Sequence, residues 1–205
     1  MRCLRPVVLA TVVLAASIAP DDLGAQAPRR PVSIGLGGGG TLPIGDFASD
    51  TKTGLHGTGY LQYEPERNVW AVRGEFAYHR SDYTDEFLGA VNADPDDDLR
   101  NGVSYLGAAA VLVGRKKEGS LTPYLLGGFG AYRLTASQTT GATVQSESAN
   151  GFGFNAGAGI RLGATSGFFL EARFHQFSIT PDAAPGQTAE KSTYQMIPVT
   201  LGFRF

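Results

Sequence analysis

Eight stretches of this sequence alternate apolar residues with polar or small ones at a period of two. In the last stretch, Thr193 to Phe205, five apolar residues fall on one parity: Ile197, Val199, Leu201, Phe203 and Phe205. A period of two predicts a β-strand with one apolar face, because successive side chains of a strand point to opposite sides. The eight stretches are Val32 to Leu42, His56 to Glu64, Val69 to Arg80, Gly102 to Gly114, Thr122 to Thr135, Gly151 to Gly163, Gly167 to Ser178 and Thr193 to Phe205. The fourth and fifth are apolar on both parities, so their facing stays open.

The connections between these stretches alternate strictly between long and short. The long polar ones are Pro43 to Leu55, Ser81 to Asn101, Ala136 to Asn150 and Ile179 to Ser192. The short ones are Pro65 to Asn68, Arg115 to Leu121 and Ala164 to Ser166. An up-and-down barrel would gather all long loops at one end, and each stretch is about as long as a tilted membrane strand of ~9–11 residues. The sequence therefore predicts an all-β fold, an eight-stranded antiparallel up-and-down transmembrane β-barrel.

The parity opposite the apolar one carries charges of both signs. These residues are Arg73, Glu75, Arg133, Arg161, Glu171, Arg173 and Arg204. All four lysines fall in loops or turns, at Lys52, Lys116, Lys117 and Lys191, although a solvated strand face would normally carry lysine. The interior of an eight-stranded barrel is filled by side chains, and a charge buried there needs a partner. We therefore interpret the seven charged residues as a lumen charge network and the apolar parity as the lipid-facing one.

Aromatic residues cluster near the ends of the predicted strands, where the aromatic girdles of a membrane barrel belong. They are Tyr63, Trp70, Tyr78, Tyr124, Tyr132, Phe152, Phe168 and Phe205.

The amino-terminal residues have the pattern of an export signal. Arg2 and Arg5 precede an apolar stretch from Val7 to Ile18, and Ala25-Gln26-Ala27 has the small-x-small form of a cleavage site. The apolar stretch is too short to span a bilayer as a helix. We expect residues 1–27 to be a signal peptide and residues 28–205 to form the transmembrane β-barrel domain.

Composition narrows the function classes. A length of 205 residues favours one domain, and 28 glycines weaken the case for long helices. The net charge of −2 offers no basic face for nucleic acid. The single cysteine, Cys3, lies in the predicted signal peptide, so the mature chain would have neither a disulfide nor a reactive thiol. No cofactor is indicated.

The final strand, which ends Gly202-Phe203-Arg204-Phe205, resembles the terminal signal of bacterial outer-membrane β-barrel proteins. The whole mature chain is similar to the small eight-stranded OmpA/OmpX-like barrels of that family. The resemblance implies an outer-membrane location, with the termini in the periplasm and the long loops outside the cell. It implies that the barrel-assembly machinery reads an assembly signal that includes Tyr194, Phe203 and Phe205. It further implies a monomer among outer-membrane lipids, with a structural or adhesive role and an external ligand at the four loops.

Two other functions compete with this interpretation. A soluble lipocalin-like carrier would point its apolar face inward and bind an apolar ligand there. A membrane-embedded lipid-modifying enzyme is suggested by His79 and Ser81, because outer-membrane lipid A deacylases use a His-x-Ser pair with a glutamate on the lipid-facing surface. His79 departs from that family, since its parity is that of Arg73 and Glu75, the predicted lumen face. We therefore expect no enzymatic activity.

Metal binding has little support in the sequence. No pair among His56, His79 and His175 has a metal-ligand spacing along one strand. The acidic segment Asp94 to Asp98 could hold Ca²⁺, but an EF-hand loop that began at Asp94 would need glycine at its sixth position and glutamate at its twelfth, which are Leu99 and Tyr105. We interpret the segment as a solvated loop tip, with weak cation binding left open.

Overall fold

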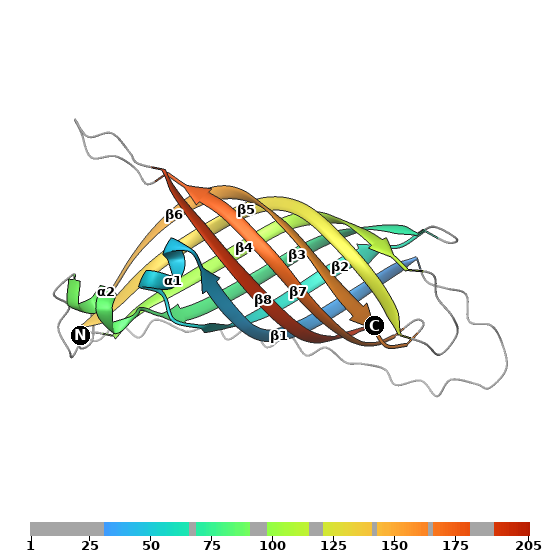
Figure 1. The fold of residues 1–205 in the computed structure, drawn as a ribbon, viewed down its shortest axis with the longest axis horizontal. Coiled ribbons are helices and arrows are strands. Elements are labelled where there is room, and N and C mark those ends of the chain that lie inside the picture. Colours follow the sequence, from blue (N-terminus) through green and yellow to red (C-terminus); the bar gives the residue numbers. More distant parts are fainter. Residues whose placement is uncertain are drawn as a thin grey trace, which may run out of the picture.

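The strands of the chain form one closed antiparallel barrel in the order β1 to β8 (Figure 1). The computed structural model describes residues 31–65, 69–90, 98–114, 121–140, 143–163, 166–180 and 191–205. The strands are β1 (Val32–Ile44), β2 (Gly54–Tyr63), β3 (Trp70–Asp82), β4 (Asp98–Val113), β5 (Thr122–Thr140), β6 (Thr143–Arg161), β7 (Gly167–Ile179) and β8 (Ser192–Arg204). The predicted fold class is confirmed.

Closure of the barrel depends on the pairing of its first and last strands. Gly35 of β1 pairs with Arg204 of β8, and the register continues to Ile44 opposite Gln195. Beyond β8, the backbone N–H of Phe205 donates to the carbonyl of Ile34 at 2.8 Å. Because every strand has a partner on both sides, no strand of the barrel is an edge strand along its whole length. Residues 143–150 of β6 extend beyond β7 and pair with β5 alone.

The two ends of the barrel differ. One, which we call the loop end, carries two short helices, α1 (Asp46–Asp50) between β1 and β2 and α2 (Asp85–Ala90) between β3 and β4. The other, the turn end, holds the start of β1 and the carboxyl terminus (Figure 1). Neither helix is long or apolar enough to cross a membrane.

The connection predicted at Ala136 to Asn150 is largely strand instead of loop. β5 and β6 continue through it as a paired hairpin that reaches Thr140 opposite Thr143. The segment is rich in serine, threonine and glutamine, which look like loop residues in the sequence but hydrogen bond across the hairpin, as between the hydroxyls of Ser137 and Ser146 at 3.1 Å. β4 likewise begins at Asp98, inside the predicted loop Ser81 to Asn101.

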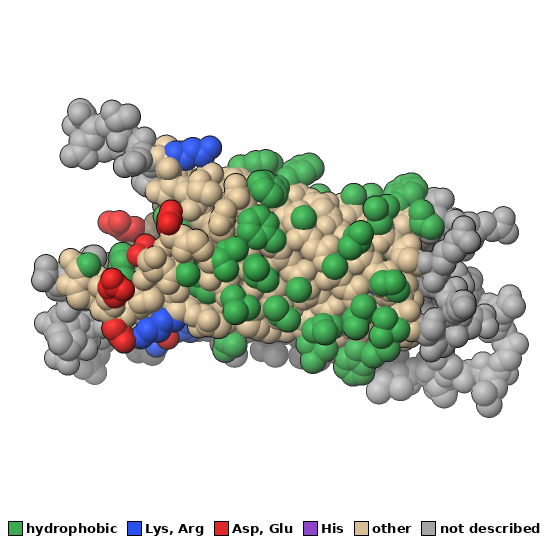
Figure 2. All heavy atoms as spheres, viewed as in Figure 1, with side chains coloured by type: hydrophobic (Ala, Val, Ile, Leu, Met, Phe, Trp, Pro, Cys, Tyr) green, Lys and Arg blue, Asp and Glu red, His purple; other side chains and the backbone are tan. Residues whose placement is uncertain are grey.

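The polarity of the barrel is inverted relative to a water-soluble protein. Outward-facing Leu201 and Phe129 are each 60% exposed, whereas inward-facing Arg73 and Arg173 are 1% and 3% exposed. Figure 2 shows hydrophobic side chains spread over the strands, with the visible charged side chains gathered at the loop end. This arrangement is the one expected of a barrel surrounded by lipid, and it contradicts the apolar interior of a lipocalin-like carrier.

The facing of β4 and β5 corrects part of the sequence interpretation. Tyr124 and Tyr132, predicted for the aromatic girdle, are 3% and 1% exposed in the lumen. Val103, Tyr105, Val111, Val113 and Leu126 are also buried in the lumen. The outward residues of these strands are apolar as well, including Leu106, Leu112 and Leu125, so the pattern could not separate the two faces.

Several predictions fall wholly or mainly outside the described residues. They include the signal peptide at residues 1–27 and the acidic segment Asp94 to Asp98, of which only the backbone of Asp98 is described, at the start of β4. They also include the predicted connections Pro65 to Asn68, Arg115 to Leu121, Ala164 to Ser166 and Ile179 to Ser192.

Candidate functional site in the lumen and at the loop end

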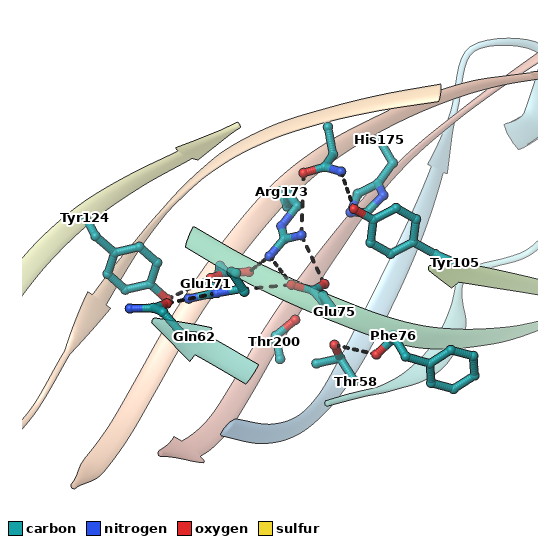
Figure 3. Close-up of polar contacts among 12 residues, drawn as sticks. Thr58, Gln62, Glu75, Phe76, Tyr105, Tyr124, Glu171, Arg173, His175 and Thr200 are labelled. Carbon is teal, nitrogen blue, oxygen red and sulfur yellow. Dashed lines mark hydrogen bonds and ion pairs between the residues drawn. The ribbon is translucent and has the colours of Figure 1, made fainter. Parts of the chain in front are cut away.

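Four charged side chains form an ion cluster at the centre of the lumen. Arg73 and Glu75 come from β3, and Glu171 and Arg173 come from β7 on the other side of the barrel. Figure 3 labels Glu75, Glu171 and Arg173 of this cluster. The guanidinium of Arg173 donates to both oxygens of Glu75, at 3.0 and 2.7 Å, and also to Glu171. Arg73 donates to Glu171 at 2.8 Å. The cluster contains two positive and two negative groups, so its formal charge is zero.

Neutral side chains from other strands complete the hydrogen bonding of this cluster. The Tyr124 hydroxyl donates to Glu171 at 2.8 Å from β5 (Figure 3), and Arg73 Nε donates to Gln62 of β2 at 3.1 Å. The guanidinium of Arg73 also lies 3.9 Å from the centroid of the Tyr60 ring. Such a network satisfies ions that would otherwise be costly to bury.

A second ion group closes the turn end of the lumen. Arg161 donates to Glu64 at 3.0 Å, and Arg204 lies 3.3 Å from the same carboxylate oxygen. All three side chains are largely buried. Glu64 was not among the residues predicted for the charge network, although it shares the parity of Gln62 and directly follows β2. That parity was the signal that could have found it.

The structure brings six of the seven predicted network residues into the lumen, and it places Arg133 outside. Arg133 is exposed on β5, and its guanidinium donates to the hydroxyl of Ser148 at 2.7 Å. Tyr132 points into the lumen, so its neighbour Arg133 points outward. The prediction that Arg133 belongs to the lumen network was therefore wrong. The two faces of β5 were exchanged in the sequence interpretation, so the contact of Tyr124 with Glu171 was also missed.

Three histidines form a layer above the central ions, towards the loop end. The Thr41 hydroxyl lies 3.1 Å from His56 Nδ1 and 2.8 Å from His79 Nδ1, and His56 Nε2 lies 2.8 Å from the Thr200 hydroxyl. His175 Nδ1 lies 2.8 Å from the Tyr132 hydroxyl. Within the described part of the chain, no three His, Cys, Asp or Glu side chains are placed to hold a metal ion. His79 faces the lumen and not the lipid, unlike the His-x-Ser pair of the deacylases.

The residues predicted for the assembly signal lie at opposite ends of β8. Phe203 and Phe205 pack edge to face at the turn end, with ring centroids 5.0 Å apart. Tyr194 is half-buried at the loop end, where its ring stacks on Phe177 and meets Phe47.

The loop end is covered by α1, which inserts one apolar side chain into the barrel. Phe47 is 6% exposed and belongs to a buried cluster with Val103, Tyr105, Tyr132, Phe177, Ile179 and Met196. α1 is joined to the segment before α2, because the Thr84 hydroxyl donates to the carbonyl of Ser49 at 2.7 Å and Thr51 bridges to Tyr83. Lys52 pairs with Asp85 at 2.7 Å. The two helices therefore form one platform over the barrel.

Comparisons with solved structures find small outer-membrane barrels of the same fold. Ail, the attachment invasion locus protein of Yersinia pestis, is 19% identical, with a TM-score of 0.53 over 85% of this chain and 97% of that one. Neisserial surface protein A is 16% identical, with a TM-score of 0.52 over 85% and 96%. A major outer membrane protein from Thermus thermophilus is 10% identical, with a TM-score of 0.55 over 86% and 99%.

Among curated proteins, no relative matches this chain. The family model described as outer membrane protein beta-barrel domain matches residues 7–205, which is nearly the entire sequence. The chain therefore belongs to the outer membrane protein beta-barrel domain family.

Proposed function

We propose that this protein is an integral outer-membrane barrel with a filled lumen, whose loop end is a contact surface facing the outside of the cell. The observation that carries the proposal is the inverted polarity, with exposed apolar side chains around the barrel and paired ions inside it. A surface role needs no chemistry in the lumen, and the charged side chains of the lumen are paired with one another. We accordingly propose a non-enzymatic function without a cofactor.

The orientation that we propose places the turn end in the periplasm and the loop end outside. Membrane barrels of this class have short periplasmic turns and longer external loops, and both helices lie at the loop end. We further propose that residues 1–27 direct export and are removed. The barrel-assembly machinery would then insert a monomer by way of β8, with Tyr194, Phe203 and Phe205 in its signal.

The platform formed by α1 and α2 is the part of this surface that the described residues define best. The two helices carry Asp46, Asp50, Asp85 and Glu86, all exposed, and neither helix contains lysine or arginine. Ail has been solved in complex with the heparin analogue sucrose octasulfate, which supports an external ligand for barrels of this fold. The acidic platform here would repel such a polyanion, so we propose a contact surface for a cationic or neutral partner.

Single-cysteine labelling in whole cells tests both location and orientation. Ala48 is exposed on α1, and Ser166 is exposed at the turn end. We expect a membrane-impermeant maleimide to label Ala48→Cys in intact cells and Ser166→Cys only after permeabilisation. The outer-membrane fraction should contain a band whose migration changes on heating. Recovery in the soluble periplasm would refute the membrane location, and the reverse labelling pattern would refute only the orientation.

A further inference from the structure

The three histidines of this chain, His56, His79 and His175, come together in the lumen. His56 of β2 pairs directly with His79 of β3, and their ring centroids lie 5.1 Å apart. His175 reaches them from β7, with its ring centroid 6.1 Å from that of His79. None of the three residues is more than 8% exposed. We call them the histidine layer.

Hydroxyl groups are the side-chain partners of these rings, and they suit neutral imidazoles. The Thr41 hydroxyl lies within hydrogen-bond distance of Nδ1 of both His56 and His79, and it has one proton to donate. One of the two nitrogens therefore accepts from Thr41, and the other carries a proton of its own. His79 Nε2 is buried, and no described residue is its hydrogen-bond partner. Hydroxyls offer no negative charge to a ring that takes a second proton.

The charged side chains that face the layer are already paired with one another. Glu75 and Glu171 line the small cavity beneath the histidines, and both accept from Arg173. Arg173 lies two residues before His175 on the same face of β7, so it places positive charge beside the layer. Within the described part of the chain, no ion pair joins a histidine to a carboxylate.

The other strands add no charge at this level among the described residues. β4 and β5 contribute Tyr105 and Tyr132, whose rings pack edge to face on His175 and whose hydroxyls are ordinarily neutral below about pH 10. The contacts from β1, β6 and β8 come from Thr41, Asn155, Met196 and Thr200. No group of opposite charge is therefore left over for a protonated imidazole.

A second proton on any of these rings would be a buried charge without a partner. Such a charge is strongly destabilising, because no protein group replaces its hydration. Water cannot replace it here, since the cavity beneath the layer measures about 10 Å³, at the lower limit of the space that one molecule needs. An imidazole in water, by contrast, gains a proton at about pH 6.5. Protonation of the rings and packing of the layer therefore oppose each other.

We propose that the histidine layer is an acid-sensitive lock, which holds β2, β3 and β7 together across the lumen at neutral pH and releases them on acidification. Below about pH 6.5 the unfolded chain binds protons at all three rings, whereas the packed layer excludes them. The unfolded state then binds more protons than the folded one, so the free energy of unfolding falls as the pH falls. The inference goes beyond the proposed contact surface and does not depend on the proposed orientation.

The test measures how many protons the purified full-length barrel takes up when it unfolds. Urea titrations in lipid vesicles give the free energy of unfolding at about pH 7.5, 6.5 and 5.5, and its slope against pH gives that number. Changes in this window report on the layer, because the chain contains no other histidine and other side chains ordinarily titrate outside the window.

The test variant is His56→Gln with His79→Gln and His175→Gln, because glutamine keeps hydrogen-bonding groups and stays neutral at every pH of the series. The control variant is Met196→Ala. Met196 is fully buried and pairs with His175 across β7 and β8. The control therefore removes packing at the level of the layer while all three imidazoles remain.

We expect the unfolding equilibrium constant of the native chain to rise from pH 7.5 to pH 5.5 by about tenfold for each histidine that the packed layer keeps neutral. The test variant should show almost no change over the same range. Met196→Ala should be less stable than the native chain at every pH and should keep the native slope. The single variants His79→Gln and His175→Gln should each remove the uptake of about one proton, which keeps the test valid if the combined variant fails to fold.

A native slope that persists in all the histidine variants would overturn the proposal, because the protons would then bind elsewhere. A native chain whose stability does not change with pH would overturn it as well. Nitrogen NMR spectra of the imidazoles give a direct reading: neutral rings in the folded barrel at about pH 5.5 support the lock, and protonated rings in a barrel that is still folded refute it. None of these results depends on the labelling experiment above, so the proposed orientation can fail while the lock stands.

Discussion

Arg173 shows how a single residue is held inside this barrel. Its side chain is 3% exposed and contacts both Glu75 and Glu171, which reach it from different strands. A guanidinium withdrawn from water to this extent is stable only if protein groups replace its hydration. Glu75 and Glu171 depend on Arg173 in the same way, because each of these two side chains is only 6% exposed.

Replacement of Arg173 by methionine should therefore leave two buried carboxylates competing for the one remaining cation, Arg73. We expect the free energy of unfolding to fall by about 3–5 kcal/mol, the usual cost of breaking a buried ion pair on one side. A urea titration of the barrel in lipid vesicles measures this. Arg133→Met is the matched control, since Arg133 is exposed and its loss should cost far less. Equal losses in the two variants would contradict the role given to the ion cluster.

At the scale of elements, β4, β5 and β6 are shaped by a row of inward-facing glycines. Gly107 pairs with Gly130, and Gly130 pairs with Gly153. The ring of Tyr105 lies against Gly107 and Gly130, and Phe177 lies against Gly153. A Cβ placed on Gly130 would meet the Tyr105 ring and the carbonyl oxygen of Leu106. The row lets a narrow interior accept large aromatic rings, because three neighbouring strands contribute no side chain there.

Gly130→Ala should therefore lower the free energy of unfolding by about 1–3 kcal/mol through overpacking. Gly74→Ala is the matched control, because Gly74 faces outward on β3 and a Cβ there would meet no atom within 4 Å. We expect this control to be neutral or slightly stabilising, since alanine has fewer unfolded conformations than glycine. Temperature scans of heat-modifiable migration compare the two variants. A stable Gly130→Ala barrel with an unchanged transition would show that Tyr105 can repack.

At the scale of the whole molecule, the lumen is filled in successive layers. Phe47 and its aromatic neighbours lie at the loop end, the histidines and the central ions follow, and Glu64 with Arg161 and Arg204 lies at the turn end. A cavity between the histidines and the ions measures about 10 Å³, which is at the lower limit of the space that one water molecule needs. Barrels with open channels are built from more strands, ~16–18.

We therefore expect the protein to form no stable open channel when it is reconstituted into planar bilayers. The measurement is single-channel conductance, with a general porin as the positive control in the same membranes. Reproducible conductance steps from the native chain would contradict a filled lumen. Steps that appeared only in Phe47→Ala would instead identify α1 as the barrier at the loop end.

Much of the architecture could be predicted from the sequence, because the decisive signals are local. Period-two alternation follows from strand geometry, and it located all eight strands. The facing of β3 and β7 was predictable because an arginine and a glutamate two residues apart share one parity, as Glu171 and Arg173 do in β7. Arg204 marks the inward parity of β8. Chain closure was foreseeable in the same way, since an apolar terminal strand needs a partner.

The contacts between side chains of different strands were decided by the tertiary structure alone. Arg173 and Glu75 are 98 residues apart, and only the closure of the barrel brings them to 2.7 Å. The facing of β4 and β5, and with it the position of Arg133, depended on which neighbours fill the lumen opposite them. Both faces of these strands are apolar, and one meets lipid while the other meets side chains. Composition cannot distinguish two environments that favour the same residues, so packing across the barrel determined the outcome.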